Sequence, residues 1–453
     1  MTKKTLISDF TTGNIPKQLA LFAAPLFLSS LLQIVYNMAD MVIVGHVMGK
    51  TGLSAASVGG DISGFLTFFA MGFTSAGQII ISQYIGSGKH EKLGKFIATM
   101  FTTLMAIAMV LSVGCFIFRH QLLAVMNTPS AAYFEALNYS TVCMSGLVFI
   151  YGYNMTGAVL RGMGDSRHPF IFISLSSVLN IILDIVFVVY MHMGCFGAAL
   201  ATVISQAVSF LLCAGFLVIK FKEMNFNLHP GDFISPDKEM LLSLIKLGLP
   251  MAIKSASIQF SKLFVNSWIN SYGVAVSAFA GIANKINSIS NLISNATNTA
   301  GSSMVGQNIG AGKFKRVPKI VLTIAIFTLS IATALSCVVL AFPTQVFSIF
   351  TTDEAVIAIG MEYLFVAVLI FFGSACRSPA NALINGSGNY KINFATAIFD
   401  GIIMRIGLSL IFGLVLNMKY VGFWLGDAVA GFTPMVIGIV FYISGKWKKK
   451  MIK

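Results

Sequence analysis

The chain contains twelve long apolar stretches, and these constrain its fold more than any other feature. A helix needs roughly 20 apolar residues to cross the hydrocarbon of a bilayer. Membrane-spanning strands would instead show short segments of alternating polarity. The apolar stretches here are continuous, so we predict twelve transmembrane helices near residues 16–45, 52–82, 95–118, 133–160, 168–190, 194–219, 241–270, 275–305, 320–342, 355–385, 392–416 and 420–444.

The composition agrees with this all-α membrane class. Hydrophobic residues make up 56% of the chain and charged residues 10%. A soluble fold with this composition would leave much of its apolar surface in water. In a bilayer that surface is solvated, provided that the backbone polar groups are satisfied within helices. The first stretch is too long for a cleaved signal peptide.

Basic residues predict the orientation, because they are more plentiful in cytoplasmic loops. With both termini inside, the inner segments and their flanks hold 22 of the 30 Lys and Arg residues, and the outer loops hold three, namely Lys50, Arg119 and Lys419. We therefore expect a multi-pass protein of the cell (inner or plasma) membrane with cytoplasmic termini. The net charge of +14 then reflects loops that face anionic lipid, and we expect no nucleic-acid partner.

The two halves of the chain look like copies of each other. The alignment that places Gln83–Lys89 on Gln307–Lys313 also places Arg161–Asp165 on Asn385–Asn389, without a gap. Six spans per copy would insert both copies the same way up, related by a pseudo-two-fold axis along the membrane normal. We therefore predict a six-helix bundle at 1–219, a cytoplasmic linker at 220–240 and a second six-helix bundle at 241–453.

Polar residues inside the first-half spans mark a candidate ion pathway, since ionisable groups at membrane depth are costly. Helical spacing places Gln33, Tyr36, Asn37 and Asp40 on one face, and Asn180 and Asp184 on another. Thr202, Ser205 and Gln206 form a third polar face. Their oxygens suit Na⁺, while two nearby carboxylates disfavour double ionisation and suit proton carriage. A purely structural role in helix packing is the alternative.

The second half is basic at the same depth. One predicted face carries Gln259, Lys262, Asn266 and Asn270, and the next span carries a stripe of Asn284, Asn287, Asn291, Asn295 and Asn298. Such faces cannot meet lipid, so we expect them to line a cavity. Asp400 and Arg405 are expected to pair, Asp427 to serve another cation, and Lys254 to reach an interface with its ammonium. Two roles stay open for Lys262: pairing with a first-half carboxylate, or binding an anionic group.

Catalytic chemistry is not expected. The six cysteines and six histidines are scattered, without the spacing of a metal site or a disulfide framework. No nucleophile–base arrangement is visible either. We expect no enzyme activity, no cofactor and no metal beyond a possible Na⁺ at Asp40, Asn180, Asp184 and Thr202.

Several motifs resemble those of the multidrug and toxic compound extrusion (MATE) transporters, in particular the DNA-damage-inducible F-type branch. They are Pro25, the stretch Gln33–Gly45, Gln83–Lys89, the loop Leu160–Pro169 and Leu179–Asp184. The resemblance spans nearly the whole chain. One departure is that the seventh and eighth spans carry Lys262 and Lys285, where some branches carry carboxylates.

The resemblance implies two six-helix bundles, alternating access and export of cationic or amphipathic drugs, toxins or metabolites against Na⁺ or H⁺. It also implies a cation site at Asp40, Asn180, Asp184 and Thr202. Cavity residues are expected at Gln33, Tyr36, Asn37, Gln206, Gln259, Lys262, Asn266, Asn287 and Asn291. A flippase for a lipid-linked intermediate is the alternative function. The expected partners are a small-molecule substrate and the bilayer, with the protein acting as a monomer.

Overall fold

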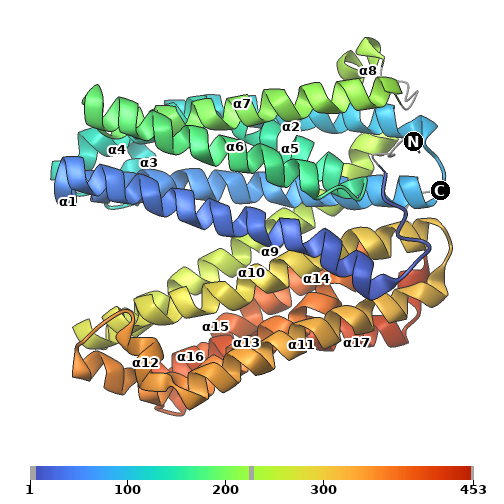
Figure 1. The fold of residues 1–453 in the computed structure, drawn as a ribbon. Helices are drawn as coiled ribbons and strands as arrows, with labels where there is room; N and C mark the ends of the chain where they lie inside the picture. The colour runs from blue at the N-terminus through green and yellow to red at the C-terminus, as the bar shows by residue number, and fades with distance from the viewer. Residues whose placement is uncertain (1–6, 224–228, 450–453) are drawn as a thin grey trace. The chain divides into compact units, whose positions relative to one another are not determined.

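The computed structural model describes residues 7–223 and 229–449. The chain ends at 1–6 and 450–453, and residues 224–228 of the predicted linker, lie outside the described residues. Helices account for nearly all of the described chain (Figure 1). Those before the linker are α1 (Ile15–Gly86), α2 (Glu91–Ile117), α3 (Arg119–Val125), α4 (Tyr133–Ser145), α5 (Leu147–Gly162), α6 (Arg167–Asp184) and α7 (Gly194–Glu223).

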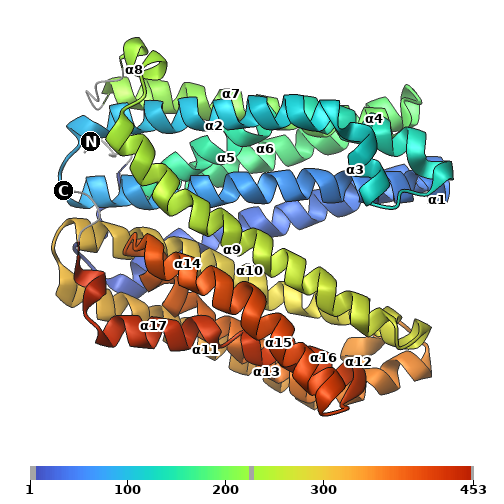
Figure 2. The same cartoon turned by 180° about the vertical axis from the view of Figure 1, so that it is seen from behind.

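A short helix, α8 (Pro230–Ile234), follows, and the rest of the described chain contains nine more α-helices. They are α9 (Lys238–Asn270), α10 (Val274–Gly310), α11 (Val317–Ala341), α12 (Pro343–Ser348), α13 (Glu354–Gly386), α14 (Tyr390–Ile398), α15 (Arg405–Leu410), α16 (Lys419–Ala430) and α17 (Thr433–Ile443). Three π-helical segments, Ile185–Tyr190, Phe399–Met404 and Ile411–Val415, continue α6, α14 and α15. Figure 2 shows α14 and α15 following one another along one helical path.

Nine of the described helices are long and apolar enough to cross a membrane, or ten if the bent pair Ser130–Ser145 and Leu147–Gly162 is one span. The 72-residue α1 contains a break at Gly49 (φ 61°, ψ −151°), a conformation that favours glycine. A straight helix of that length would measure about 108 Å, far more than one bilayer. Two further spans follow if α1 is divided at Gly49 and if the 37-residue α10, which carries the asparagine stripe, also crosses the membrane. The total is then compatible with the twelve predicted spans.

The contacts of the chain divide it into two compact units, and their boundaries differ from those predicted. Among the described residues, the first unit comprises 7–8 and 28–248, and the second comprises 9–27 and 249–449. The start of α1 belongs to the second unit because Phe10, Leu19 and Phe22 share a core with Met304 and Ile320. Backbone groups of Phe10 also bond the side chains of Gln307 (2.9 Å) and Asn308 (3.0 Å).

Local geometry repeats between the halves in the alignment that places Gln83 on Gln307. Glycines with positive φ occur in pairs at 49 and 273, 88 and 312, and 164 and 388. Gly162 packs where an added Cβ would lie 2.9 Å from the Gln78 carbonyl oxygen. Gly386 packs in the same way, with 2.7 Å to the carbonyl oxygen of Ser302. The same helix ends and the same close helix contact therefore occur in both halves.

The described end of the linker packs on the first unit. The Thr102 hydroxyl donates to the Phe233 carbonyl oxygen (2.8 Å), and the Asp237 N–H donates to the Thr99 hydroxyl (3.2 Å). Asp237 also forms an ion pair with Lys95 at 3.0 Å. Its Oδ1 accepts from the backbone N–H groups of Glu239 and Met240, so Asp237 caps the start of α9.

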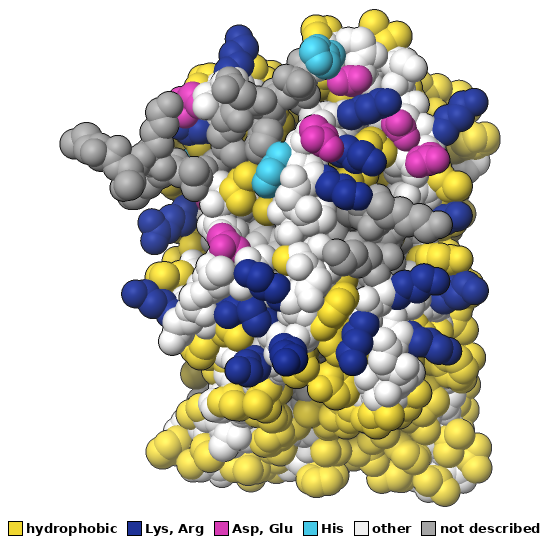
Figure 3. All heavy atoms as spheres, turned by 90° about the vertical axis from the view of Figure 1, so that its right-hand side faces the viewer, with side chains coloured by type: hydrophobic (Ala, Val, Ile, Leu, Met, Phe, Trp, Pro, Cys, Tyr) yellow, Lys and Arg dark blue, Asp and Glu magenta, His cyan; other side chains and the backbone are white. Residues whose placement is uncertain are grey.

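The surface carries many exposed apolar side chains, such as Val110 and Phe65. A monomeric protein in water rarely exposes apolar patches on this scale, whereas a bilayer solvates them. Lys and Arg side chains gather on the face drawn in Figure 3, at the end of the molecule where α2 begins and α7 ends.

Candidate functional site: an acidic cluster and a charged cavity

The first unit brings two carboxyl groups together inside its helices. Asp184 is the last residue of α6, at the junction with the π-helical segment Ile185–Tyr190, and it is completely buried. Asp40 on α1 is half-buried, and its carboxyl group lies close enough to that of Asp184 to interact electrostatically. Wide π-helical turns inside α-helices occur frequently at functional sites.

The oxygens of this cluster lack hydrogen-bond donors among the described residues. They are Asp40 Oδ1, both Asp184 carboxylate oxygens, Asn180 Oδ1 and Gln206 Oε1, all buried. The Asn180 amide reaches the Thr202 hydroxyl only at 3.5 Å, near the limit for a hydrogen bond. An ionised carboxylate only accepts hydrogen bonds, so the buried carboxylate oxygens without donors favour a bound proton or cation.

A cavity of about 20 Å³ opens beside this cluster. That volume holds about one water molecule or small ion, and it excludes an organic substrate. Its lining residues come from α1, α5, α6 and α7 and are Gln33, Tyr36, Tyr153, Ile173, Ser176, Ser177, Asn180, Thr202, Ser205 and Gln206. Ser176 holds α6 against α7 by donating to the Ser205 carbonyl oxygen at 2.8 Å.

Five of the residues predicted for this region line the cavity together with Asn180, namely Gln33, Tyr36, Thr202, Ser205 and Gln206. Asp40 and Asp184 lie next to it rather than in its lining, and Asn37 is exposed on α1. Sequence reasoning missed Tyr153, Ser176 and Ser177. It also missed Tyr139, which interacts electrostatically with both carboxyl groups. Single tyrosines and serines in apolar spans give no signal on their own.

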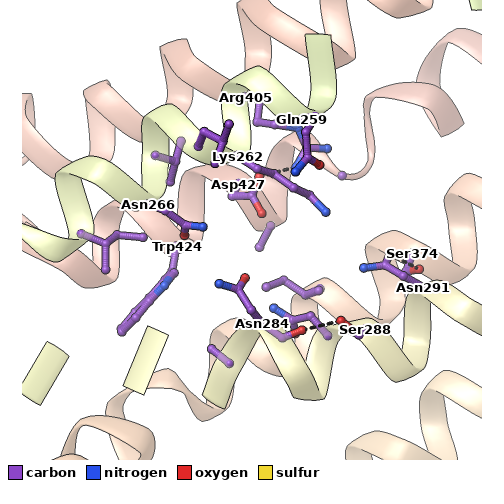
Figure 4. Close-up of a pocket in the computed structure, with 18 of the residues that line it drawn as sticks. Gln259, Lys262, Asn266, Asn284, Ser288, Asn291, Ser374, Arg405, Trp424 and Asp427 are labelled. Carbon is purple, nitrogen blue, oxygen red and sulfur yellow. Dashed lines mark hydrogen bonds and ion pairs between the residues drawn. The ribbon is translucent and has the colours of Figure 1, made fainter. Parts of the chain in front are cut away.

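The second unit contains a larger cavity of about 290 Å³ (Figure 4). Its polar lining includes five residues predicted from the sequence: Gln259, Lys262, Asn266, Asn287 and Asn291. Asn284 of the stripe also lines it, while Asn270, Asn295 and Asn298 do not. The rest of the polar and aromatic lining is Ser288, Ser374, Arg377, Arg405, Trp424 and Asp427.

One arginine links two acidic residues at this cavity. Arg405 Nη2 donates to Asp400 Oδ1 at 3.1 Å, and Arg405 Nη1 donates to Asp427 Oδ1. Asp400 is completely buried within the π-helical segment Phe399–Met404, and Arg377 Nη2 lies 3.7 Å from the same oxygen. The predicted Asp400–Arg405 pair is confirmed. Asp427 was expected to serve another cation, but it binds the same guanidinium, because packing brings it beside Arg405.

The prediction for Lys254 is wrong. Its side chain is 9% exposed and donates to Asn381 Oδ1 at 2.6 Å. The lysine therefore does not extend to an interface, because an amide oxygen on α13 satisfies its ammonium inside the unit. Lys285, by contrast, is exposed on α10.

A cluster of packed aromatic rings lies beside the cavity. Tyr363 and Trp424 pack edge-to-face at 5.0 Å between ring centroids, and Phe279 contacts both rings. The Asn287 amide donates to the Tyr363 hydroxyl at 2.8 Å. This contact fixes one asparagine of the stripe and leaves its Oδ1 without a donor among the described residues.

Comparison with known proteins shows similarity to transporters over nearly the whole chain. The MatE family model matches twice, at residues 25–186 and 250–415, one match in each half. The probable multidrug resistance protein YpnP of Bacillus subtilis is 29% identical, covering 97% of both chains. The probable multidrug resistance protein NorM of Thermotoga maritima is 24% identical, covering 97% of this chain and 94% of its own.

Solved structures show the same fold. A MOP superfamily transporter from Pyrococcus furiosus superimposes with a TM-score of 0.88 at 23% identity, covering 99% of this chain and 100% of its own. A multidrug resistance MATE transporter in an outward-facing conformation gives 0.89 at 22% identity, with the same coverage. From the family model and the relatives together, this chain belongs to the MatE family of multidrug and toxin extrusion transporters.

Proposed function

We propose that the protein is a cation-coupled antiporter that exports cationic or amphipathic compounds by alternating access. The observation that supports coupling is the set of buried oxygens without donors on Asp40, Asn180 and Asp184. Two carboxylates that share a site resist simultaneous ionisation. A proton or Na⁺ relieves that repulsion and the cost of burying charge.

The coupling requires that the ion bind the two access states differently, since a ligand shifts an equilibrium only through differential affinity. In this proposal Asp40 and Asp184 bind the ion in one state, and substrate binding favours the other. Thr202 and Asn180 supply the neutral oxygens. The adjacent cavity of about 20 Å³ gives a small ion access to the carboxylates.

The finer features of the family assignment are part of the same proposal. Twelve spans, both termini in the cytoplasm and membership of the DNA-damage-inducible F-type branch agree with the charge distribution and with the motifs at 33–45 and 160–169. The matched relatives carry multidrug resistance and extrusion names, which does not favour a lipid-linked flippase.

Transport in proteoliposomes tests the proposal. Purified protein is reconstituted with an entrapped cationic fluorescent dye, and Na⁺ and pH gradients are imposed separately. We expect one of the two gradients to drive dye movement against its concentration gradient. Dye movement that never exceeds equilibration under either gradient would exclude coupled antiport.

A further inference from the structure

We propose that the charged cavity of the second unit binds the anionic group, a carboxylate or a phosphate, of a small organic molecule. Lys262 and Arg377 would hold the anion, and Asn291 would donate a further hydrogen bond. The inference rests on the proposed function in one respect, because it takes this cavity as a substrate site. Among the compounds proposed there, it selects amphipathic ones that carry an anionic group over simple cations. It adds the chemical class of the group that the cavity recognises.

The charges of this cluster do not cancel. Four basic residues, Lys254, Lys262, Arg377 and Arg405, lie here with only two acidic ones, Asp400 and Asp427. Arg405 already binds both carboxylates, and Lys254 binds the neutral Asn381. Two positive charges are therefore left without equivalent counter-charges, and a bound anion would supply one.

Lys262 is the least compensated member of the cluster. Within the described part of the second unit, its ammonium has no hydrogen bond and no carboxylate oxygen within 4.0 Å. It interacts at longer range with Asp427, which Arg405 already binds. Figure 4 shows the Lys262 side chain ending in the open space of the cavity. A charged lysine without a counter-charge is costly inside a membrane protein, so an anion at this position is favoured.

Arg377 provides a second group with unused hydrogen-bonding capacity. Its closest contact with a carboxylate, Nη2 to Asp400 Oδ1, measures 3.7 Å, which exceeds a hydrogen bond. Its buried Nε has no acceptor among the described residues. The guanidinium lines the cavity, and its planar array of donors matches carboxylate and phosphate oxygens.

The neutral part of the lining fits an organic anion better than a bare inorganic one. Asn291 accepts from the Ser374 hydroxyl through Oδ1 (3.4 Å), and Figure 4 shows its amide nitrogen directed into the cavity. Ile269, Ile370 and Trp424 supply apolar and aromatic surface beside these polar groups. A volume of about 290 Å³ is close to the lower range of small-molecule sites.

A purely structural network would leave this geometry unexplained. In such a network each cation would be hydrogen-bonded to a carboxylate, as Arg405 is, whereas Arg377 only approaches Asp400 at 3.7 Å. Lys262 instead stands on the cavity side of the Arg405–Asp427 pair, in contact with open space (Figure 4). The pairs therefore stabilise the helices, while Lys262 and Arg377 remain available to a ligand.

Calorimetric binding to the purified full-length protein in a neutral detergent tests the inference. The probes are 2-naphthoate and 2-naphthyl phosphate, with neutral 2-naphthamide as the matched control ligand. We expect both anions to bind the wild type at least tenfold more tightly than the amide. Lys262→Met should remove that preference, whereas Lys285→Met, at an exposed lysine of α10, should keep it.

The melting temperature of unliganded Lys262→Met, which we expect to match the wild type, shows that the variant is folded. Arg377→Gln keeps hydrogen-bond donors but loses the charge. We expect it to reduce the preference for the anions over the amide less than Lys262→Met does. Equal binding of anion and amide, equal anion binding by wild type and Lys262→Met, or no anion binding at millimolar concentration would each overturn the inference.

One further measurement distinguishes a lipid phosphate from a soluble anion at the site. Another distinguishes failure of the anion-binding inference from failure of the proposed antiport. Phosphatidylglycerol that competes with 2-naphthyl phosphate, where phosphatidylcholine does not, identifies a lipid phosphate at the site; absence of competition identifies a soluble anion. Gradient-driven dye efflux without anion binding would reject this inference alone. Anion binding without gradient-driven efflux would reject the proposed function alone.

Discussion

The acidic cluster of the first unit and the charged cavity of the second occupy related positions in the repeat, yet their charges are arranged in opposite ways. The alignment of the two halves pairs Tyr153 with Arg377, Ser176 with Asp400 and Val203 with Asp427. Asp184 in turn is paired with Leu408. In the first unit, three buried carboxylate oxygens lack donors among the described residues. In the second, one guanidinium binds an oxygen of each carboxylate, and Asp400 Oδ2 has no donor in the described part of the chain.

Under the proposed function, this difference divides ion coupling and solute recognition between the two units. Uncompensated carboxylates change their energy strongly when a cation binds, so they suit a site that must respond to a gradient. Paired charges are already stabilised and leave a fixed positive excess, which suits recognition of a solute. The close helix contacts at Gly162 and Gly386 are nevertheless the same in both units.

The largest expected effect comes from removing a charge of the acidic cluster. It tests whether this cluster alone couples the ion gradient to efflux. Asp184→Asn keeps the shape of the side chain and removes its charge, so we expect gradient-driven efflux to fall at least tenfold while membrane insertion stays normal. Asp40→Asn should do the same. Proteoliposome transport with equal protein loading measures both.

Asp61→Asn is the matched control, because Asp61 is an exposed carboxylate on the same helix as Asp40. We expect it to transport normally. Concentrative efflux by Asp184→Asn at the wild-type rate would show that the two units do not differ in coupling. Loss of membrane expression would favour the structural role for this carboxylate.

Removal of Arg405 tests whether the charges of the second unit are mutually compensated. Arg405→Met leaves Asp400 and Asp427 without their shared partner. Breaking a buried ion pair from one side costs about 3–5 kcal/mol, so we expect a clear fall in melting temperature. The triple variant Arg405→Met, Asp400→Asn, Asp427→Asn removes both orphaned charges and should recover most of the loss.

Thermal unfolding in detergent, followed by tryptophan fluorescence, measures these variants. A triple variant no more stable than Arg405→Met would mean that packing of the long guanidinium side chain, rather than charge, accounts for the effect. If Arg405→Met is as stable as the wild type, Arg405 does not compensate the charges of Asp400 and Asp427. The second unit would then not differ from the first in charge compensation.

The shared helix contact predicts a similar, smaller loss in both units. Alanine at Gly386 would place Cβ 2.7 Å from the Ser302 carbonyl oxygen, and alanine at Gly162 would place it 2.9 Å from that of Gln78. Overpacking against backbone typically costs about 1–3 kcal/mol, so both variants should melt at lower temperature. Gly215→Ala, which meets nothing within 4 Å, should be unaffected. A loss confined to one unit would show that the repeat does not extend to this contact.

The smallest effect concerns the caps at the starts of α1 and α9. Asn14 caps α1 through Lys17 N–H, whereas Asp237 caps α9 and pairs with Lys95. The hydrogen bond from Met240 N–H and the contact with Lys95 lower the pKa of Asp237. Because its pKa is lower in the folded state, ionised Asp237 stabilises the fold above the unfolded-state pKa near 4. This stabilisation is lost as the pH falls from there through the lower pKa of the folded state.

Asp237→Asn keeps the cap and removes this titration, so the variant should lose less stability on acidification than the wild type. Asp237→Ala should cost about 1 kcal/mol at neutral pH, as for other lost caps. Melting curves between pH 3 and 7 distinguish them. Parallel pH profiles for wild type and Asp237→Asn would show that the charge contributes nothing at this cap.

Much of the fold was predictable because the bilayer restricts it. Long apolar stretches indicate helices, and the glycines at 49, 88 and 164 recur at 273, 312 and 388, all with positive φ in the structure. Polar faces on single helices were also predictable, since spacing by three or four residues needs no tertiary information. Asn287 and Asn291, for example, do line one cavity.

The unit boundaries were not predictable in the same way. Residues 9–27 read as the start of the first bundle, yet they pack with the second unit. An apolar helix has no sequence signal for the partner it packs against, because many apolar surfaces satisfy it equally well. Only the contacts of Phe10 and Phe22 with their actual neighbours decided the matter.

The sequence by itself determined the membrane class, the duplication and the residues on each polar helix face, because these follow from local periodicity and from the cost of polar groups in lipid. Tertiary structure alone decided which faces meet. It put Arg405 between Asp400 and Asp427, and it buried Lys254 against Asn381. A buried charge takes whichever partner packing brings near it, and that partner can be distant in sequence, as Asn381 is from Lys254, so spacing along the chain cannot reveal it.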